Sequence, residues 1–413
     1  MKFRKSRALA AVALAGSFVV LALPTVSSAS GGGVSATSFN ANYTTMAALT
    51  KIATAGKGGI GVILPDEVSS NRYVEFDAPN LTTAFVDAGL PAADLSVQNA
   101  LGVDATEISI AQADIAAKDK VLVMDPLDST TGITIEKDAA KAGVKVIDYD
   151  RLTTGKGASA EDYVSFNNVA VGTLIGQGEL ACLTSEHITK PVVYVMNGST
   201  STDNNAILFA QGYDAVLNAK GFKASVGGAG NAKTVNETGT GTWTPSTALT
   251  DFQGAYSKDA KINAVLTPND ENAAPIIAYL QKKGLKPGVI PFTGQDATLL
   301  GFQNIISGYQ CGTVYKPIWQ EAQAAVALAL YLRDGKTPPS ALVNGSTTDP
   351  VTKRKVPSVL LTATWVTAPL IQSTVIANGV INAVALCTSV KPAVTGDSSV
   401  PTFKADCAKY KIS

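Results

Sequence analysis

The sequence predicts an α/β protein with two lobes, each a doubly wound parallel sheet, joined by a hinge of several chain segments. Short apolar runs alternate with amphipathic segments from residue 59 onward, and the alternation starts again after a link at residues 152–162. Short polar stretches also follow several of the apolar runs. Because strand-helix-strand units of this length stack as right-handed crossovers, their repetition predicts doubly wound parallel sheets.

The first series of elements begins near Gly59. Its strands are continuous apolar runs, as expected for parallel strands that are buried on both faces. Its helices repeat apolar residues with the period of an amphipathic helix. The expected order is strand 59–64, helix 76–89, strand 94–100, helix 105–118, strand 120–126, helix 134–143 and strand 144–151.

The second series follows the link and has the same alternation. Its expected order is helix 169–185, strand 192–198, helix 204–221, strand 223–228, helix 247–258, strand 262–268, helix 271–284 and strand 289–294. Residues 301–336 add a helix, a strand at 311–317 and another helix, and residues 356–368 are expected to form a long late strand. This is more chain than either lobe alone requires, so the chain is expected to cross between the lobes more than once.

These series predict the domain boundaries. The N-terminal lobe is expected to contain residues 57–152 and 297–352, and the C-terminal lobe residues 153–296 and 353–386. Residues 387–413 are expected to form a C-terminal tail. A ligand cleft is expected where the two lobes meet.

The N-terminal end is typical of an exported protein. Residues 1–29 combine a basic start, an apolar core at 8–24 and small residues at 27–29, which is the pattern of a secretory signal peptide. Residues 30–56 are expected to form a leader that is partly helical at most. We therefore expect a protein of the periplasm or of the outer face of the cell envelope. An uncleaved membrane anchor is the alternative, and no cysteine precedes Cys182 to carry a lipid.

Composition excludes several classes of function. Lys plus Arg and Asp plus Glu both number 33, so the basic surface expected of a nucleic-acid binder is missing and a neutral ligand is favoured. His187 is the single histidine, which leaves little basis for a metal site or a histidine-based catalytic centre. We expect no metal, no cofactor and no enzymatic activity.

The four cysteines suggest disulfides, because the chain is expected to be exported. Pairing of Cys387 with Cys407 is favoured, since it closes a short loop and fixes the C-terminal tail. Cys182 and Cys311 then remain to pair with each other. Both could instead be buried free thiols.

Four polar stretches follow expected strands at or beyond their carboxyl ends. They are Asn71–Tyr73, Tyr149–Arg151, Pro268–Asp270 and Gly294–Asp296. Because the carboxyl ends of parallel strands meet at one edge of the sheet, we expect these side chains to converge on one crevice. The sequence therefore predicts a binding site for a small polar molecule.

Polar motifs along the chain resemble those of a known family. The motifs are NRY, DYDR, VSFNN, STDNNAILFAQGY, GTW, TPND, TGQDA and TVYKP, and they extend over about residues 59–382. Their order and spacing are similar to those of ABC-transporter sugar-binding proteins with the type I periplasmic-binding fold, most of all the D-xylose-binding proteins. The resemblance implies a monosaccharide ligand captured by hinge closure, an ABC permease as membrane partner, and a monomer.

The resemblance also implies which residues bind the sugar. Arginine and lysine would donate hydrogen bonds to sugar oxygens, aspartates would accept from hydroxyl groups, and the amides would do both. Trp243 and Tyr73 would pack against the C–H faces of the ring. The expected ligand-binding residues are Arg72, Tyr73, Arg151, Asp203, Asn205, Trp243, Asn269, Asp296 and Lys316.

Some of these assignments have alternatives. One residue of Asp203–Asn205 is expected to cap the following helix, as Asp and Asn commonly do. Asp125, Asp128 and Asp270 are weaker candidates, because turn formation or the orientation of a neighbour explains them equally well. For the whole protein, a sugar sensor co-receptor is the alternative function. A secreted sugar-processing enzyme that uses paired carboxylates is a further alternative.

Overall fold

The computed structural model of the protein describes residues 34–222, 234–235, 241–389 and 402–413. The expected signal peptide and the strand expected at 223–228 lie outside the described residues. The described residues belong to one compact unit. Among the described segments, no helix is both long enough and apolar enough to span a bilayer.

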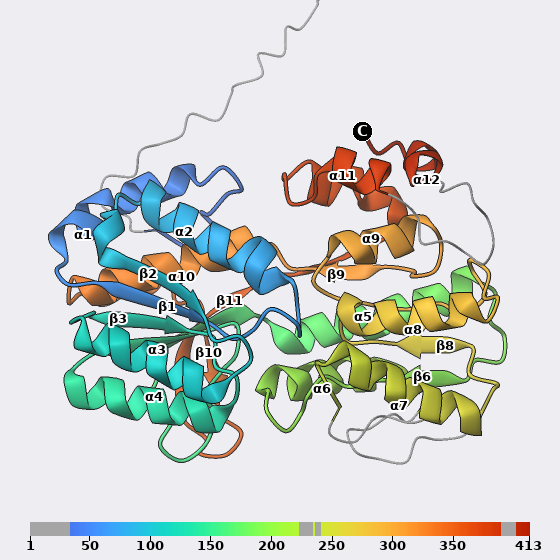
Figure 1. Ribbon diagram of the computed structural model, residues 1–413, viewed down its shortest axis with the longest axis horizontal. Coiled ribbons are helices and arrows are strands. Elements are labelled where there is room, and N and C mark those ends of the chain that lie inside the picture. Colours follow the sequence, from blue (N-terminus) through green and yellow to red (C-terminus); the bar gives the residue numbers. More distant parts are fainter. Residues whose placement is uncertain (1–33, 223–233, 236–240, 390–401) are drawn as a thin grey trace, which may run out of the picture. The chain divides into compact units, whose positions relative to one another are not determined.

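A seven-stranded sheet organises the first lobe (Figure 1). Its strand order is β10-β11-β5-β4-β3-β1-β2, and every pairing is parallel except that between β10 and β11. The parallel core therefore has the doubly wound character that the sequence predicts. The strands are β1 Ile60–Leu64, β2 Leu95–Asn99, β3 Val121–Met124, β4 Lys145–Tyr149, β5 Asp162–Phe166, β10 Gly345–Thr348 and β11 Lys355–Leu361.

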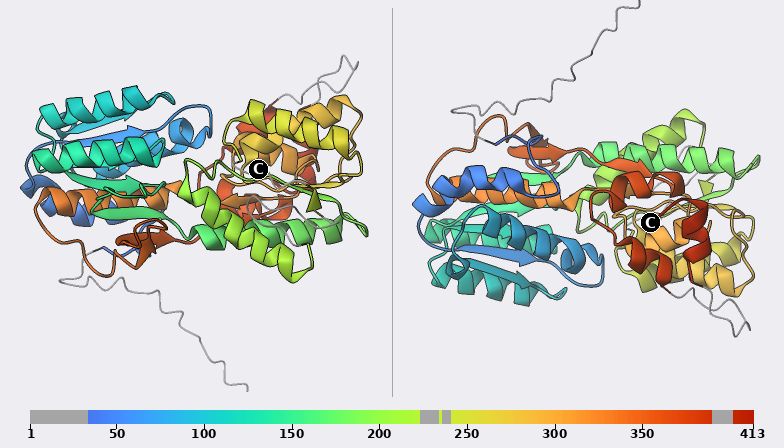
Figure 2. Two further views of the ribbon diagram at one scale, coloured as in Figure 1. Left: turned by 90° about the horizontal axis from the view of Figure 1, so that it is seen from below. Right: turned by 90° about the horizontal axis from the view of Figure 1, so that it is seen from above.

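Helices cover both faces of this sheet (Figure 2). On β1, Val62 and Leu64 belong to the core beneath α2 and α10, whereas Ile63 belongs to the core beneath α3 and α4. This alternation follows from the two-residue period of a strand. The helical elements of the lobe are η1 Thr44–Leu49, α1 Thr50–Ala55, η2 Tyr73–Asp77, α2 Ala78–Asp87, α3 Asp104–Ala116, α4 Ser129–Ala142 and α10 Ile318–Arg333.

A smaller parallel sheet organises the second lobe. Its strand order is β7-β6-β8, and single bridges at Phe292 and Gln295 lead from β8 to β9, which pairs with β12. The strands are β6 Val193–Val195, β7 Thr234–Val235, β8 Ala264–Leu266, β9 Thr313–Tyr315 and β12 Thr364–Val366. The helices are α5 Asn168–Ser185, α6 Asn204–Ala219, α7 Pro245–Lys258, α8 Asp270–Lys282 and α9 Leu299–Ile306.

Helices α5 and α6 pack closely because glycines lie at their contact. A Cβ atom on Gly172 would lie 2.0 Å from the carbonyl oxygen of Phe209, and one on Gly212 would lie 2.3 Å from that of Val169. Only a residue without Cβ fits at such distances. This contact fixes the amino end of α6, which carries Asp203 and Asn205.

The strand pairing differs from the expected lobe boundaries. Strand β5 was not predicted, and it joins the first sheet, where β11 pairs with it in turn. The expected late strand 356–368 is divided, because β11 belongs to the first sheet while β12 pairs with β9 in the second lobe. The strand expected at 289–294 contributes only an isolated bridge at Phe292. Strand β10 was also not predicted.

The chain therefore crosses between the lobes at several points. The crossings lie between β5 and α5, between β9 and α10, and between β11 and β12. Helix α9 and strand β9, expected in the N-terminal lobe, lie with the second lobe instead. The prediction of two α/β lobes joined by several segments is confirmed.

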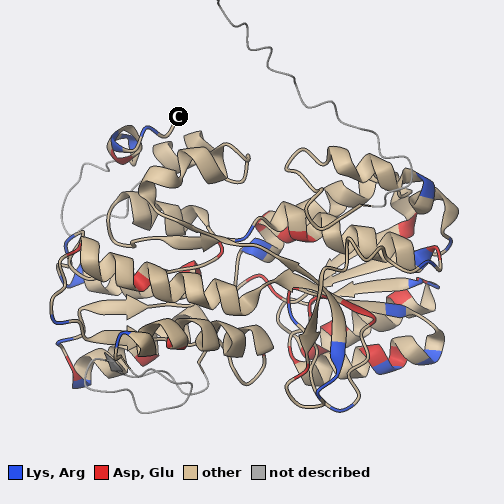
Figure 3. Cartoon of the chain, turned by 180° about the vertical axis from the view of Figure 1, so that it is seen from behind, with Lys and Arg blue, Asp and Glu red and all other residues tan. Residues whose placement is uncertain are grey.

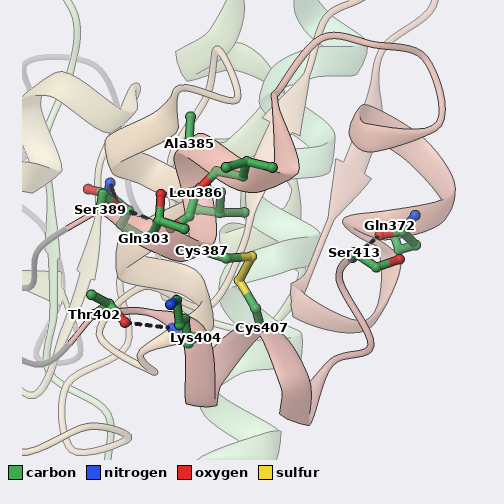
Figure 4. Close-up of a disulfide and its surroundings, with 12 residues drawn as sticks. Gln303, Gln372, Ala385, Leu386, Cys387, Ser389, Thr402, Lys404, Cys407 and Ser413 are labelled. Carbon is green, nitrogen blue, oxygen red and sulfur yellow. Dashed lines mark hydrogen bonds between the residues drawn. A yellow bond between two sulfur atoms is a disulfide. The ribbon is translucent and has the colours of Figure 1, made fainter.

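Both expected disulfides are present. Cys182 pairs with Cys311, and Cys387 pairs with Cys407 (Figure 4). The second bridge joins α11 Ala383–Thr388 to α12 Lys404–Lys409. Phe403 and Ile412 share an apolar cluster with Phe302 of α9, so the C-terminal segment packs on the second lobe.

Glu179 is an unusual residue of the core. It lies on α5, has no exposed surface, and neither of its carboxylate oxygens has a hydrogen-bond partner among the described residues. Burial raises the pKa of Glu179 to about 8. The folded protein therefore favours the neutral carboxyl, so its contribution to stability is complete below about pH 4.5 and is lost as the pH rises towards 8.

We expect the free energy of unfolding to fall less in the Glu179→Gln variant than in the unmodified protein when the pH is raised from 5 to 8. The amide does not ionise, whereas the carboxyl lowers the free energy of unfolding by about 1.4 kcal/mol for each pH unit in this range. Between pH 5 and pH 8 the unmodified protein should therefore lose up to about 3 kcal/mol more than the variant. Urea unfolding at both pH values measures it. Glu67→Gln, at an exposed position, is the matched control. Equal pH dependence of all three proteins would contradict this account of Glu179.

Candidate functional site

One cavity brings together every residue that was predicted to bind the ligand. It encloses about 310 Å³ of space between atoms, including its mouth. Both lobes contribute to it through segments that follow β1, β4, β8 and β9 and through the start of α6. The lining residues are Ser69, Ser70, Arg72, Tyr73, Asp150, Arg151, Asp203, Asn205, Phe209, Trp243, Asn269, Gln295, Asp296 and Lys316.

Arg72 is the centre of a buried ion network beside this cavity. Its Nε and Nη2 donate to the two carboxylate oxygens of Asp77 at 2.9 and 2.7 Å. Nη2 also donates to Glu321 at 2.8 Å, and Nη1 donates to Asp150 at 3.0 Å. A guanidinium has five N–H groups, so a single one on Nη1 is left for a ligand. Arg72 is therefore mainly a structural centre of the site.

The charged groups of this network shift one another's pKa values. Burial alone would lower the pKa of Arg72, but Asp150, Asp77 and Glu321 raise it well above its ordinary value. Burial likewise raises the pKa of Asp150, yet the nearby cations, Arg72 foremost, lower it to about 2. Burial raises the pKa of Glu321 well above normal despite Arg72. The network therefore contains firmly ionised Arg72 and Asp150 beside a carboxyl that takes up a proton readily.

Asp150 connects the two lobes through its backbone. It follows β4 with a φ of 56°, in the left-handed region that few residues other than glycine adopt. Its carbonyl oxygen accepts from Tyr163 Oη at 2.8 Å and from Asn205 Nδ2 at 2.7 Å. Asp296 and Ala297 in the second lobe also have positive φ values, 85° and 55°. Backbone strain thus occurs at the site in both lobes, as is common where function depends on geometry.

Tyr73 lies between two guanidinium groups. Its ring centre is 5.4 Å from Cζ of Arg72 and 5.6 Å from Cζ of Arg151. Its hydroxyl donates to Asp150 at 3.2 Å and accepts from Nη2 of Arg151 at 3.0 Å. Nε of Arg151 lies 3.6 Å from a carboxylate oxygen of Asp203, so the arginine extends towards the second lobe. Tyr73 therefore orients Arg151 in addition to lining the cavity.

Asp203 caps helix α6 and holds Trp243. One carboxylate oxygen accepts from the backbone N–H of Asn205 at 2.8 Å, and the other accepts from Nε1 of Trp243 at 3.1 Å. The indole also meets Phe209 edge-on, with ring centres 6.4 Å apart. A Cβ on Gly198 would lie 2.2 Å from the indole, so glycine is required there. These contacts fix Trp243 as a rigid apolar wall.

The side chain of Asn205 binds protein groups on all sides. Its Oδ1 accepts from Asn168 at 2.7 Å and lies 3.0 Å from the hydroxyl oxygen of Tyr163, while its Nδ2 donates to the carbonyl of Asp150. An amide nitrogen has two N–H groups, so one remains for a ligand. Asn205 thus acts as a link between the lobes as well as a wall of the cavity.

Further hydrogen bonds cross the cavity between the lobes. Asn269 caps α8 and donates from Nδ2 to the carbonyl of Ser69 at 3.3 Å. Glu271 accepts from the backbone N–H of Asn71 at 3.1 Å and from the hydroxyl of Ser70 at 3.3 Å. We call this pair of contacts to Glu271 the interlobe latch. The interlobe latch was not predicted from the sequence, because Glu271 lies just beyond the polar stretch Pro268–Asp270 that follows the expected strand.

Lys316 and Asp296 form an ion pair in the cavity wall. Lys316 Nζ lies 2.9 Å from Asp296 Oδ1, and both side chains are almost fully buried. The hydroxyl oxygen of Ser70 lies 3.4 Å from the other carboxylate oxygen of Asp296. The lysine also lies over the ring of Phe166, 5.9 Å from its centre. The pair is electrically neutral, so it offers polar groups to a ligand without selecting for a charge.

The weaker candidates do not line the cavity. Asp128 caps α4 by accepting from Thr130 and Thr131. Asp270 accepts from several groups of the second lobe, including Thr298. Asp125 is fully buried next to Arg151, with 3.7 Å between its Oδ1 and the guanidinium Nε. Helix capping accounts for Asp128, hydrogen bonding within the second lobe for Asp270, and charge balance for Asp125.

The arrangement suits a small, neutral, polyhydroxylated molecule. Donors and acceptors alternate around the cavity, and Trp243 supplies an apolar face. Within the described segments there is no cluster of His, Cys, Asp and Glu that could hold a metal ion. Lys and Arg are interspersed with Asp and Glu over the side shown in Figure 3, in keeping with equal numbers of the two charges.

Known proteins with a similar sequence and fold bind sugars. Residues 60–337 match the periplasmic binding protein domain. The D-xylose-binding periplasmic protein of Escherichia coli (strain K12) is 34% identical over 290 residues, 70% of this chain and 81% of that protein. A multiple sugar-binding periplasmic receptor of Rhizobium radiobacter is 30% identical over 318 residues, 75% of this chain and 86% of the receptor. A carbohydrate transporter solute-binding protein from Chloroflexus aurantiacus, solved with D-glucose, has 26% identity and a TM-score of 0.66, covering 78% of this chain and 96% of its own.

We expect Arg72→Lys to lower the free energy of unfolding by about 2 to 4 kcal/mol, because an ammonium cannot replace the fork that binds three buried carboxylates. Urea unfolding measures the loss. Arg151→Lys is the matched control, since Arg151 makes a single short contact to the protein, with Tyr73. A loss of the same size in both variants would contradict the structural role assigned to Arg72.

Proposed function

This chain belongs to the family of periplasmic binding proteins, and we propose on that premise that it captures a neutral monosaccharide and delivers it to an ABC permease. We propose D-xylose or a related sugar as the ligand and the periplasm or the outer face of the cell envelope as the location. We also propose that the protein acts as a monomer.

The observation that carries this proposal is the single cavity lined from both lobes. Its residues come from distant parts of the chain, and most of them lie in the motifs that resemble those of sugar-binding proteins. D-xylose is named in one of those relatives, and D-glucose is bound in a similar structure. The small size of the cavity favours one sugar ring over a longer saccharide.

Charge balance supports a neutral ligand. Arg72 is neutralised by the carboxylates around it, and Lys316 by Asp296. An anionic or cationic ligand would leave an unpaired charge in a buried site, which is costly. A few hydrogen bonds to charged groups and stacking on Trp243 are enough for a micromolar Kd, about 8 kcal/mol.

Binding is proposed to stabilise contact between the lobes. A sugar that bonds Arg151 on one side and Asp296 or Trp243 on the other has more partners when the lobes meet than when they are apart. It would therefore shift the population towards the closed arrangement. That arrangement is the form proposed to engage the permease.

A catalytic role has less support than transport. Asp150, Asp203 and Asp296 are the carboxylates that line the cavity, but Asp150 is engaged by Arg72, Asp203 by the α6 cap and Trp243, and Asp296 by Lys316. We infer that the sugar leaves the protein chemically unchanged. A sensor co-receptor would use the same site, and capture of the membrane partner by the sugar-loaded protein separates a permease from a receptor.

A thermal-shift screen of monosaccharides tests the substrate class. We expect D-xylose or a close relative at 100 times its Kd to stabilise the protein by about 2.7 kcal/mol. The shift should disappear in Trp243→Ala and in Asp296→Asn. Circular dichroism should show that both variants keep the fold. Recovery of the sugar unchanged after incubation is expected as well. Stabilisation by amino acids or nucleosides, with none by any sugar, would show that the substrate class is wrong.

The interlobe latch generates a second prediction. Glu271→Ala removes two hydrogen bonds that exist only when the lobes meet, so the closed form becomes less populated and the apparent sugar affinity falls about tenfold. Isothermal titration calorimetry measures the change. Glu161→Ala breaks a surface ion pair with Lys145 in the first lobe and is the matched control, expected to leave the affinity unchanged. Equal affinities in all proteins would rule out a role of the latch in binding.

A further inference from the structure

A second cavity lies against the first one and is larger. It encloses about 750 Å³ counted in the same way, compared with about 310 Å³. Asp296 and Lys316 line both cavities, so their ion pair stands between the two spaces. The sequence motifs that carry the family resemblance do not account for this second cavity.

Three aromatic side chains from separate segments line the second cavity. Tyr43 precedes η1, Phe76 lies in η2, and Trp319 lies in the first turn of α10. Each is only partly buried, so aromatic surface remains open to a ligand. Aromatic rings offer flat apolar faces of the kind that pack against the C–H groups of a sugar ring.

Hydrogen bonds hold two of these rings in position. Tyr43 has a φ of 58°, and its hydroxyl donates to Oδ1 of Asn80 on α2. Nε1 of Trp319 donates to the hydroxyl of Tyr315 at 3.1 Å. A tyrosine with left-handed backbone is uncommon and is kept where the surroundings fix it. The rings are therefore pre-organised.

The polar groups of the cavity indicate which class of ligand fits. Asn80 and Asn378 supply amides, which both donate and accept. Glu75 is the only lining residue whose charge is not paired within the wall, because Lys316 is paired with Asp296. The cavity thus has no excess positive charge for a phosphate or a carboxylate ligand, and its amides and rings match the chemistry of a neutral polyhydroxylated ring.

We propose that this second cavity is a separate binding site for a neutral saccharide ring, outside the transport site and divided from it by the Asp296–Lys316 pair. This goes beyond the proposed function, which requires the first cavity alone. Both sites would be filled by separate molecules, since the Asp296–Lys316 ion pair of 2.9 Å lines both cavities and lies between them.

The second site also spans the lobe boundary. Glu75 and Asn80 belong to the first lobe, whereas Val380 packs on the apolar cluster of the second lobe. Phe76 contacts the clusters of both lobes. A saccharide held here would therefore favour the closed arrangement and strengthen binding in the first cavity, as linkage requires.

Calorimetric titration of the full chain with D-xylose and with D-glucose tests the proposal. Concentrations up to about 10 mM reveal any site with a Kd below about 1 mM. We expect two sites per chain for at least one of these sugars. Ala41→Trp places a large ring in the second cavity and should reduce the number of sites to one, and Trp319→Ala should do the same. Since Trp319→Ala removes a packed side chain, the unfolding midpoint of both variants is measured first.

The outcomes separate this inference from the proposed function. One site that is lost in Trp243→Ala and kept in Ala41→Trp supports the transport site and overturns the second site. One site that is lost in Ala41→Trp and kept in Trp243→Ala supports the second site and contradicts the first. A single site that is lost in both Trp243→Ala and Ala41→Trp overturns the separation of the two cavities. No binding of either sugar overturns the second site and excludes D-xylose and D-glucose as the transported sugars.

Discussion

The buried guanidinium of Arg72 is the interaction on which the site depends. A cation without exposed surface is tolerated only where carboxylates compensate it and its N–H groups are bonded. Asp77, Asp150 and Glu321 do so from η2, the end of β4 and α10. These three elements are therefore fixed relative to one another, and with them the segments that present Tyr73 and the Asp150 carbonyl.

This network determines what kind of ligand the cavity can accept. Arg72 donates most of its hydrogen bonds to carboxylates of the protein. Specific contacts with a ligand are therefore left to Arg151, Lys316 and the second-lobe carboxylates. Each of these is also balanced by an opposite charge nearby. A ligand therefore meets a polar but compensated surface, and hydroxyl groups suit such a surface better than ions because they donate and accept without adding charge.

Much of the site could be predicted because parallel strands bring their carboxyl ends together. That rule, with the family motifs, places Arg151, Asn269 and Asp296 in one cavity although they are far apart in sequence. The partners of Arg72 could not be predicted, since Asp77 and Glu321 lie on helices whose local sequence gives no sign of a distant arginine. Strand pairing could not be predicted from local sequence patterns either. Residues 163–166 follow the expected link at 152–162 and were assigned to no strand, yet β4 and β11 both pair with β5 at 162–166.

The hydrogen bonds between the lobes imply that closure is not left to the sugar alone. Asn205 bonds the Asp150 carbonyl, Asn269 bonds Ser69, and Glu271 completes the latch. Each such bond contributes about 1 kcal/mol, and together they offset part of the cost of ordering the hinge. A ligand can shift the lobes only by its difference in affinity for the open and closed forms. The more the protein contributes to closure, the smaller that difference needs to be. A site whose lobes already hold each other can therefore bind a sugar through few direct contacts, which fits a cavity whose arginine and amide groups mostly serve the protein.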